Sequence, residues 1–166
     1  MKNVKTMKNY LLSILLATLF TSCQWVTDQS DKSALEKHFE IPDDAEMIAY
    51  NGYPTMVGFG QREALSISAK YKLNDDDMNS WIKKVQSKGL KPLPIEADCK
   101  NKLWFNDKLI PTDLKSGYYF CRTAGNDVLN AETTKPCDDV ENLNDIIFAI
   151  LNTEKNELSV IITSGY

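Results

Sequence analysis

The clearest pattern along the chain is an alternation of apolar and polar residues between positions 62 and 73. Serines and lysines separate five apolar residues, which are Leu65, Ile67, Ala69, Tyr71 and Leu73. Because successive side chains of a strand point to opposite faces of a sheet, this period of two predicts a strand with one buried and one solvated face.

A helical pattern follows directly, over residues 75–88. Apolar residues recur there at helical spacing, at Met78, Trp81, Ile82 and Val85. Asn74 is a residue type that caps helix N-termini, three aspartates follow it where the helix dipole favours acids, and Gly89 is of the type that ends helices. We therefore expect the main amphipathic helix of the domain here.

Weaker patterns in the first half predict one short helix and two short strands. The helix is expected over residues 31–39, where Leu35 and Phe39 share a face. The strands are expected over 45–51 and 55–60, on either side of a Gly-Tyr-Pro turn.

The second half is rich in strand patterns. Strands are expected over 117–124 and 127–133, and apolar runs over 144–152 and 157–166 predict a hairpin. The stretch 91–117 shows no clear period, and we expect it to be irregular, with room for one helical turn.

This order of elements is typical of an α+β domain. We expect a single antiparallel sheet of about five to six strands, with the main helix packed on one face. The length of 166 residues indicates one globular domain over residues 33–166. A domain of this size buries enough apolar surface to fold without a cofactor, and none is expected.

The first 22 residues have the three-part layout of a secretory signal. Residues 1–9 carry three lysines and no acid, eleven largely apolar residues follow, and Thr21 and Ser22 precede Cys23. Eleven residues form a helix of about 16 Å, well short of the roughly 30 Å core of a bilayer, so a cleaved leader is favoured over a spanning anchor. Either Met1 or Met7 fits as the start.

The sequence LFTSC at residues 19–23 resembles the lipobox of bacterial lipoproteins, although Phe20 stands where a smaller residue is commoner. The resemblance implies cleavage before Cys23 and attachment of lipid, including palmitate-type acyl chains, to this residue. Gln24 is not the aspartate that favours inner-membrane retention in that class, so the resemblance implies the outer membrane. Residues 24–32 are expected to form a flexible tether.

Charge narrows the choice of partners. Loss of the first 22 residues removes three lysines and no acid, so 16 basic and 23 acidic residues remain, a net charge of −7. An acidic surface without a basic stripe argues against a nucleic acid partner. The expected partners are the membrane, through the lipid on Cys23, and a protein of the cell envelope.

The remaining cysteines are Cys99, Cys121 and Cys137, and an exported chain meets an oxidising compartment. We favour a disulfide between Cys121 and Cys137, because it joins a predicted hairpin to the loop after it; the two pairings with Cys99 stay open. No metal site is expected, since the chain has one histidine, His38, and no Cys-x-x-Cys pair. His38 is expected to be a solvated helix residue.

Two features are candidates for a binding site. Arg62 and Arg122 are the only arginines, and an arginine in a strand favours a carboxylate partner, either inside the protein or on a ligand. Tyr53 and Phe59 flank a glycine-rich turn, where aromatic residues form either a recognition edge or the roof of the core.

An acidic loop at Asp138 and Asp139 is a third candidate, either as a solvated surface or as a site for a basic partner. No nucleotide-binding, serine-hydrolase or zinc-protease motif occurs. We therefore expect a membrane-anchored binding protein without catalysis, with an inhibitor or immunity protein as one version. The alternatives are a structural role in envelope maintenance and a carboxylate-based hydrolase using Glu63 or Asp98.

Overall fold

The computed structural model describes residues 32–33, 35–57, 61–123, 135–137 and 145–164, and only the backbone of residues 53–57 and 61–65. By contacts the chain divides into two units, Met1–Ser33 and Ala34–Tyr166. All of the strands belong to the second unit. The predicted strand at 127–133 lies outside the described residues.

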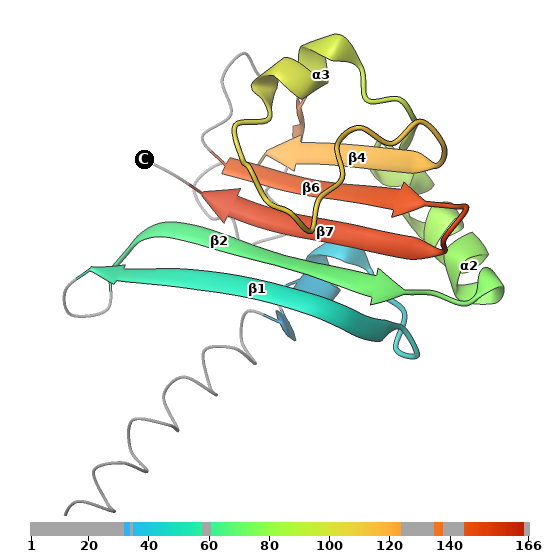
Figure 1. Cartoon of the computed structure of the whole chain (residues 1–166), viewed down its shortest axis with the longest axis horizontal. Coiled ribbons are helices and arrows are strands. Elements are labelled where there is room, and N and C mark those ends of the chain that lie inside the picture. The colour runs from blue at the N-terminus through green and yellow to red at the C-terminus, as the bar shows by residue number, and fades with distance from the viewer. Residues whose placement is uncertain (1–31, 34, 58–60, 124–134, 138–144, 165–166) are drawn as a thin grey trace, which may run out of the picture. The chain divides into compact units, whose positions relative to one another are not determined.

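The second unit is built on one antiparallel sheet of seven strands (Figure 1). Six strands follow one another across the sheet in the order β1-β2-β7-β6-β4-β3, and β5 pairs with β4. The strands are β1 (Glu46–Val57), β2 (Gln61–Lys72), β3 (Lys91–Pro92), β4 (Tyr118–Thr123), β5 (Lys135–Pro136), β6 (Asp145–Asn152) and β7 (Glu157–Ser164). The predicted α+β class is confirmed, with more strands than the five to six expected.

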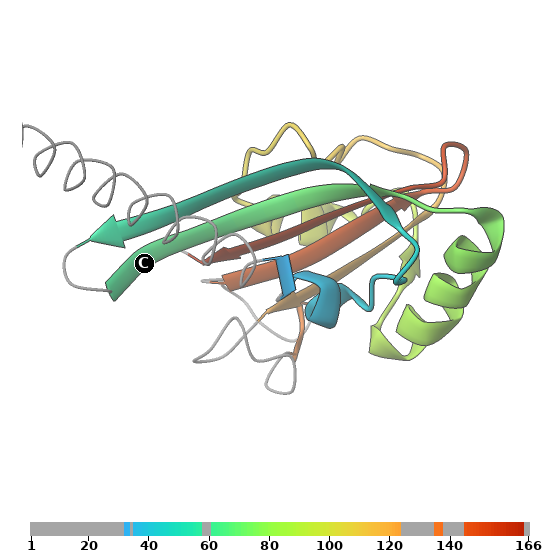
Figure 2. The ribbon, with the colours of Figure 1, turned by 90° about the horizontal axis from the view of Figure 1, so that it is seen from below.

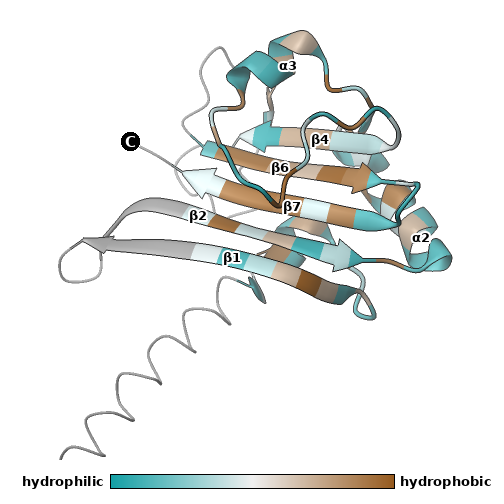
Figure 3. Cartoon of the chain, viewed as in Figure 1, coloured by the Kyte–Doolittle hydropathy of each residue, from teal (hydrophilic) through white to brown (hydrophobic). Residues whose placement is uncertain are grey.

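The two central strands, β6 and β7, are buried on both faces. Each has six consecutive buried residues between half-buried ends. On β6, Ile147, Ala149 and Leu151 belong to one apolar cluster, and Ile146, Phe148 and Ile150 belong to the other. Hydropathy colouring shows the same two strands as the most apolar part of the sheet (Figure 3). The predicted hairpin is confirmed, because β6 and β7 pair antiparallel along their whole length.

Two helical segments cover the first face of the sheet, which is the face that carries Ile147, Ala149 and Leu151. One is formed by the helix α2 (Asp75–Val85) and the 3-10 helix η1 (Gln86–Lys88), and the other by residues 35–39. Together α2 and η1 match the predicted helix at 75–88. Asn74 accepts a hydrogen bond from the backbone of Asp77, and Gly89 ends the helix in the left-handed region at φ 92°. Residues 35–39 are also helical, and the indole of Trp81 donates to the carbonyl of Phe39 at 2.7 Å.

The segment after β3 covers the second face. It contains α3 (Ala97–Lys102), and Ile95, Cys99 and Ile110 pack with Phe148 in the second apolar cluster. Figure 2 shows this segment on the opposite side of the sheet from residues 35–39. The expectation of an irregular stretch is right for most of 91–117, but it missed β3 and the role of the segment as a third layer.

The first hairpin differs from the prediction. β1 runs without interruption from Glu46 to Val57, through the residues expected to form a Gly-Tyr-Pro turn. Its partner β2 confirms the strand predicted from the alternating pattern. Pro54 is tolerated within β1 because an edge strand does not need every N–H for pairing. Residues 58–60, the end of the second predicted strand, lie outside the described residues.

Candidate binding surface

Strand β1 forms one edge of the sheet and exposes apolar side chains there. It pairs with β2 on one side and with no other described strand. Ile48 is 45% exposed and Tyr50 is 36% exposed, two of the three large apolar residues that are exposed among those described. Glu46 is the one charged residue in its twelve. The strand is therefore long, has no described partner strand along its outer side, and carries one charged residue.

An irregularity in the pairing places Ile48 outward. Met47 pairs with Tyr71 and Ala49 with Lys70, so Ile48 is the extra residue of a bulge. Beyond the bulge, Tyr50 lies opposite Ala69. A Cβ atom on Gly52 would lie only 2.5 Å from the hydroxyl of Tyr50, so the glycine makes room for the tyrosine ring along the strand. Small neighbours thus leave the ring of Tyr50 at the surface.

A polar cluster fixes β1 and β2 to the covering segment. The carboxylate of Asp107 accepts hydrogen bonds from Ser68 at 2.7 Å, from Asn51 at 3.3 Å and from the backbone of Leu109 at 2.7 Å. Ser68 is fully buried. These polar groups satisfy one another, so the cluster is a structural latch between the second face of the sheet and the segment that covers it.

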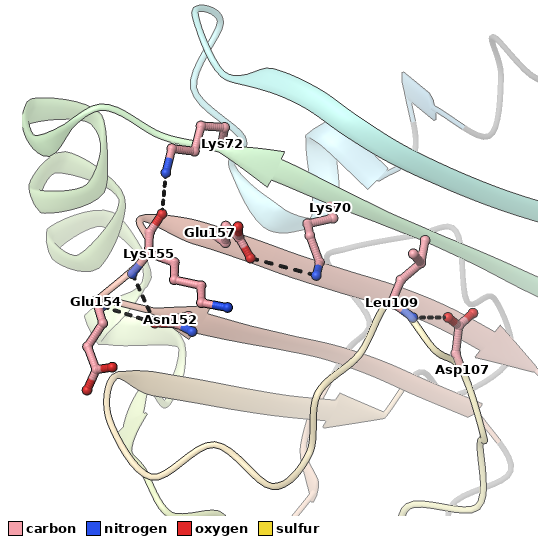
Figure 4. Close-up of polar contacts among 8 residues, drawn as sticks. All are labelled: Lys70, Lys72, Asp107, Leu109, Asn152, Glu154, Lys155 and Glu157. Atoms are coloured by element: carbon pink, nitrogen blue, oxygen red, sulfur yellow. Dashed lines mark hydrogen bonds and ion pairs between the residues drawn. The ribbon is translucent and has the colours of Figure 1, made fainter.

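Charged side chains on the same face are also engaged within the protein (Figure 4). Lys70 forms an ion pair with Glu157 at 3.7 Å, and Lys72 donates to the carbonyl of Lys155. The side chain of Asn152 accepts from the backbone of Lys155 and closes the turn between β6 and β7. The ends of β2 and β7 are therefore joined by side chains as well as by the ladder.

The side chain of Arg122, a residue of β4, reaches the C-terminal end of η1. Its guanidinium donates to the carbonyl of Lys88 at 3.0 Å, and burial lowers its pKa. Lys88 pairs with Glu40 at 2.6 Å, and this hydrogen bond holds the pKa of Glu40 below its ordinary value. The contact shown for Arg122 is thus to a backbone carbonyl at a helix C-terminus, where a cation is favoured.

The structure does not bring the predicted site residues together. Arg62 is on β2 and Arg122 on β4, and β7 and β6 lie between these strands, a separation of about 14 Å across three strand spacings. In the backbone, Tyr53 lies opposite Ser66 and Arg62 opposite Met56. The side chains of Tyr53 and Arg62 lie outside the description, as do Cys23, Phe59, Asp138 and Asp139.

The predicted disulfide is present in the structure. Cys121 on β4 and Cys137 after β5 are joined, with their Cα atoms 5.5 Å apart. The bond holds the short β5 against β4, where Arg122 lies opposite Pro136. The third cysteine of the domain, Cys99, is buried on α3 with 4% exposure.

Two buried polar residues were not recognised from the sequence. His38 is 5% exposed, so the expectation of a solvated histidine was wrong, because the short helix that carries it is packed into the first apolar cluster through Leu35 and Phe39. The hydroxyl of Tyr71 is buried and has no hydrogen-bond partner among the described residues, and burial raises the pKa of Tyr71. The alternating pattern predicted that Tyr71 faces the core but gave no signal for an unsatisfied hydroxyl.

The described ranges contain no group of three or more histidine, cysteine or acidic side chains that could hold a metal ion. Among the same residues, no helix is both long and apolar enough to cross a bilayer. Comparisons with protein-family models, curated proteins and solved structures found no match.

Proposed function

We propose that this protein is a lipid-anchored binding protein of the bacterial cell envelope, and that β1 is its docking strand. The occupant is an extended segment of a partner protein that adds to the sheet beside β1. The observation that carries the proposal is the open edge of β1, with Ile48 and Tyr50 exposed on it.

Sheet-edge addition fits the chemistry of this strand. The outward N–H and C=O groups of an edge strand bind the backbone of an added strand, and exposed side chains at the edge select its sequence. Proteins often protect such edges with lysines or inward-pointing charges. β1 has a bulge and Pro54 but one charged residue, so most of its length stays suited to pairing.

Two carboxylates of the covering segment are placed differently in the domain. The carboxylate of Asp107 is already occupied by three hydrogen bonds. Asp98, a residue considered for a carboxylate hydrolase, is exposed in the first turn of α3. No described observation favours the hydrolase or the purely structural alternative over a binding role.

The lipid anchor in this proposal rests on the leader and on the resemblance of residues 19–23 to a lipobox. Two or three acyl chains on Cys23 hold a domain at a membrane, since each buried methylene contributes about 0.8 kcal/mol. The tether at 24–32 then leaves the domain, with the edge of β1, accessible to other envelope proteins.

Site-specific photo-crosslinking in intact cells tests the docking strand. A photoreactive amino acid replaces Ile48, and a matched chain carries it at Asn79, an exposed residue of α2. We expect a discrete protein adduct from position 48 that Tyr50→Asp abolishes, and no such adduct from position 79. Equal adducts from both positions, or none from position 48, would contradict docking at β1.

A further inference from the structure

The three cysteines of the folded domain gather in one apolar cluster. Cys99 and Cys137 are 4% and 2% exposed, and Cys121 packs against the same cluster. They come from three separate elements, which are α3, β4 and the residue after β5. A buried thiol therefore shares its surroundings with the disulfide.

Contacts at both ends of α3 tie the helix that carries Cys99 to the two elements joined by this disulfide. At the start of the helix, the N–H of Glu96 donates to the hydroxyl of Tyr119 at 3.2 Å, and Tyr119 precedes Cys121 by two residues on one face of β4. At the end of the helix, Lys102 donates to the carbonyl of Cys137 at 3.2 Å. The helix is about 9 Å long at 1.5 Å per residue, so Cys99 lies between the two anchor points.

We propose that Cys99, Cys121 and Cys137 form a thiol–disulfide exchange site, in which the bridge moves from β4 to α3. The thiolate of Cys99 attacks the sulfur of Cys137, and a Cys99–Cys137 bond forms as the Cys121–Cys137 bond breaks. The electron pair of the broken bond goes to the sulfur of Cys121, which takes up the proton that Cys99 released. The step needs no external oxidant or reductant.

Exchange changes which element holds Cys137, the residue after β5. In the present state the disulfide ties Cys137 to β4, and in the exchanged state it would tie Cys137 to α3. The chain leaving α3 leads to Asp107, which binds Asn51 on β1. The exchange site therefore acts on the layer that holds the docking strand, although the chemistry itself is independent of the lipid and of any partner.

Removing one sulfur of the present bridge tests the proposed geometry. The full chain with Cys121→Ser is treated with oxidised glutathione under native conditions and digested without reduction. We expect the Cys99 and Cys137 peptides to be joined. The matched Cys99→Ser/Cys121→Ser chain should carry Cys137 only as a thiol or a glutathione adduct.

The wild-type chain provides a second test that does not depend on the folding of a variant. It is held between pH 7 and 9 without added thiol, then acid-quenched, alkylated and digested. Peptides linked through Cys99 should increase with pH, because the thiolate fraction rises toward the ordinary thiol pKa of about 8.5, and they should be absent from Cys99→Ser. If Cys121–Cys137 stays the sole linkage at every pH, the exchange site is wrong, whatever the variant shows.

Discussion

At the scale of single residues, the polar side chains inside this domain hold the layers together. Asp107 is the clearest case, because its carboxylate joins the segment after α3 to both β1 and β2. Its partner Ser68 is fully buried, so loss of the carboxylate would leave the serine hydroxyl without an acceptor. A buried polar group left unsatisfied costs about 1–3 kcal/mol.

We expect Asp107→Ala to destabilise the domain by about 1–3 kcal/mol for this reason. Denaturant unfolding followed by tryptophan fluorescence measures the change. Asp113→Ala is the matched control, since Asp113 is an exposed aspartate of the same covering segment. Equal stability of the two variants would mean that Asp107 is not a latch.

For the hydroxyl of Tyr71 we expect the opposite effect on the free energy of unfolding. Because this hydroxyl is buried and has no hydrogen-bond partner in the described part of the chain, Tyr71→Phe should leave the free energy of unfolding unchanged or raise it. A loss of more than about 1 kcal/mol would show that the hydroxyl has a partner.

The raised pKa of Tyr71 also predicts a dependence on pH. Below the ordinary tyrosine pKa of 10.0 the hydroxyl is protonated in both states, so its contribution to stability is complete. Above that pH the unfolded chain loses the proton first, and the folded state loses stability until its own pKa is reached. Unfolding measured from pH 9 upward should show a shallower loss for Tyr71→Phe than for the wild type.

At the scale of elements, the sequence patterns that predicted a strand or helix correctly are those in which local signals agree with the burial of the side chains. The alternating residues before Lys72 form β2, and Asn74, Trp81 and Gly89 mark the start, buried face and end of one helix. The apolar runs of β6 and β7 predicted strands because they are bounded by a turn at residues 153–156.

The failures arise where pairing between distant segments decides the structure. Gly52 and Pro54 predict a turn locally, but pairing with Ile67 and Leu65 keeps both residues in an extended strand. The segment after β3 has no period because it packs as a loop with one short helix, and its apolar residues meet Phe148 only in the folded domain.

Two glycines at the ends of elements give a paired prediction. Gly89 has a φ of 92° with open space around it, so Gly89→Ala should cost only the backbone strain, about 1–2 kcal/mol. Gly117 has a φ of 119°, and an added Cβ would lie 1.9 Å from the carbonyl oxygen of Leu151. Gly117→Ala should therefore be the more destabilising change in thermal unfolding, and the reverse order would contradict the described path before β4.

At the scale of the whole domain, covering layers bury both faces of the central strands, and β1 is an edge strand with no second partner among the described strands. This arrangement explains why the candidate surface could not be read from the sequence. Tyr50 is a large aromatic residue of a type that is often found in a core. Its exposure depends on the bulge at Ile48 and on the position of β1 at the edge of the sheet. Rarity alone makes Arg62 and Arg122 candidates for a binding site, and the order of strands in the sheet separates them.

We propose that a lipid on Cys23 anchors this domain at a membrane. The intact mass of the protein purified from its own membranes, after thiol alkylation without reduction, tests it most directly. We predict a chain that begins at Cys23, carries acyl groups and has one alkyl tag. An unacylated chain with another N-terminus would contradict the anchor, and the docking strand would then have to be tested on a domain that is not held at a membrane.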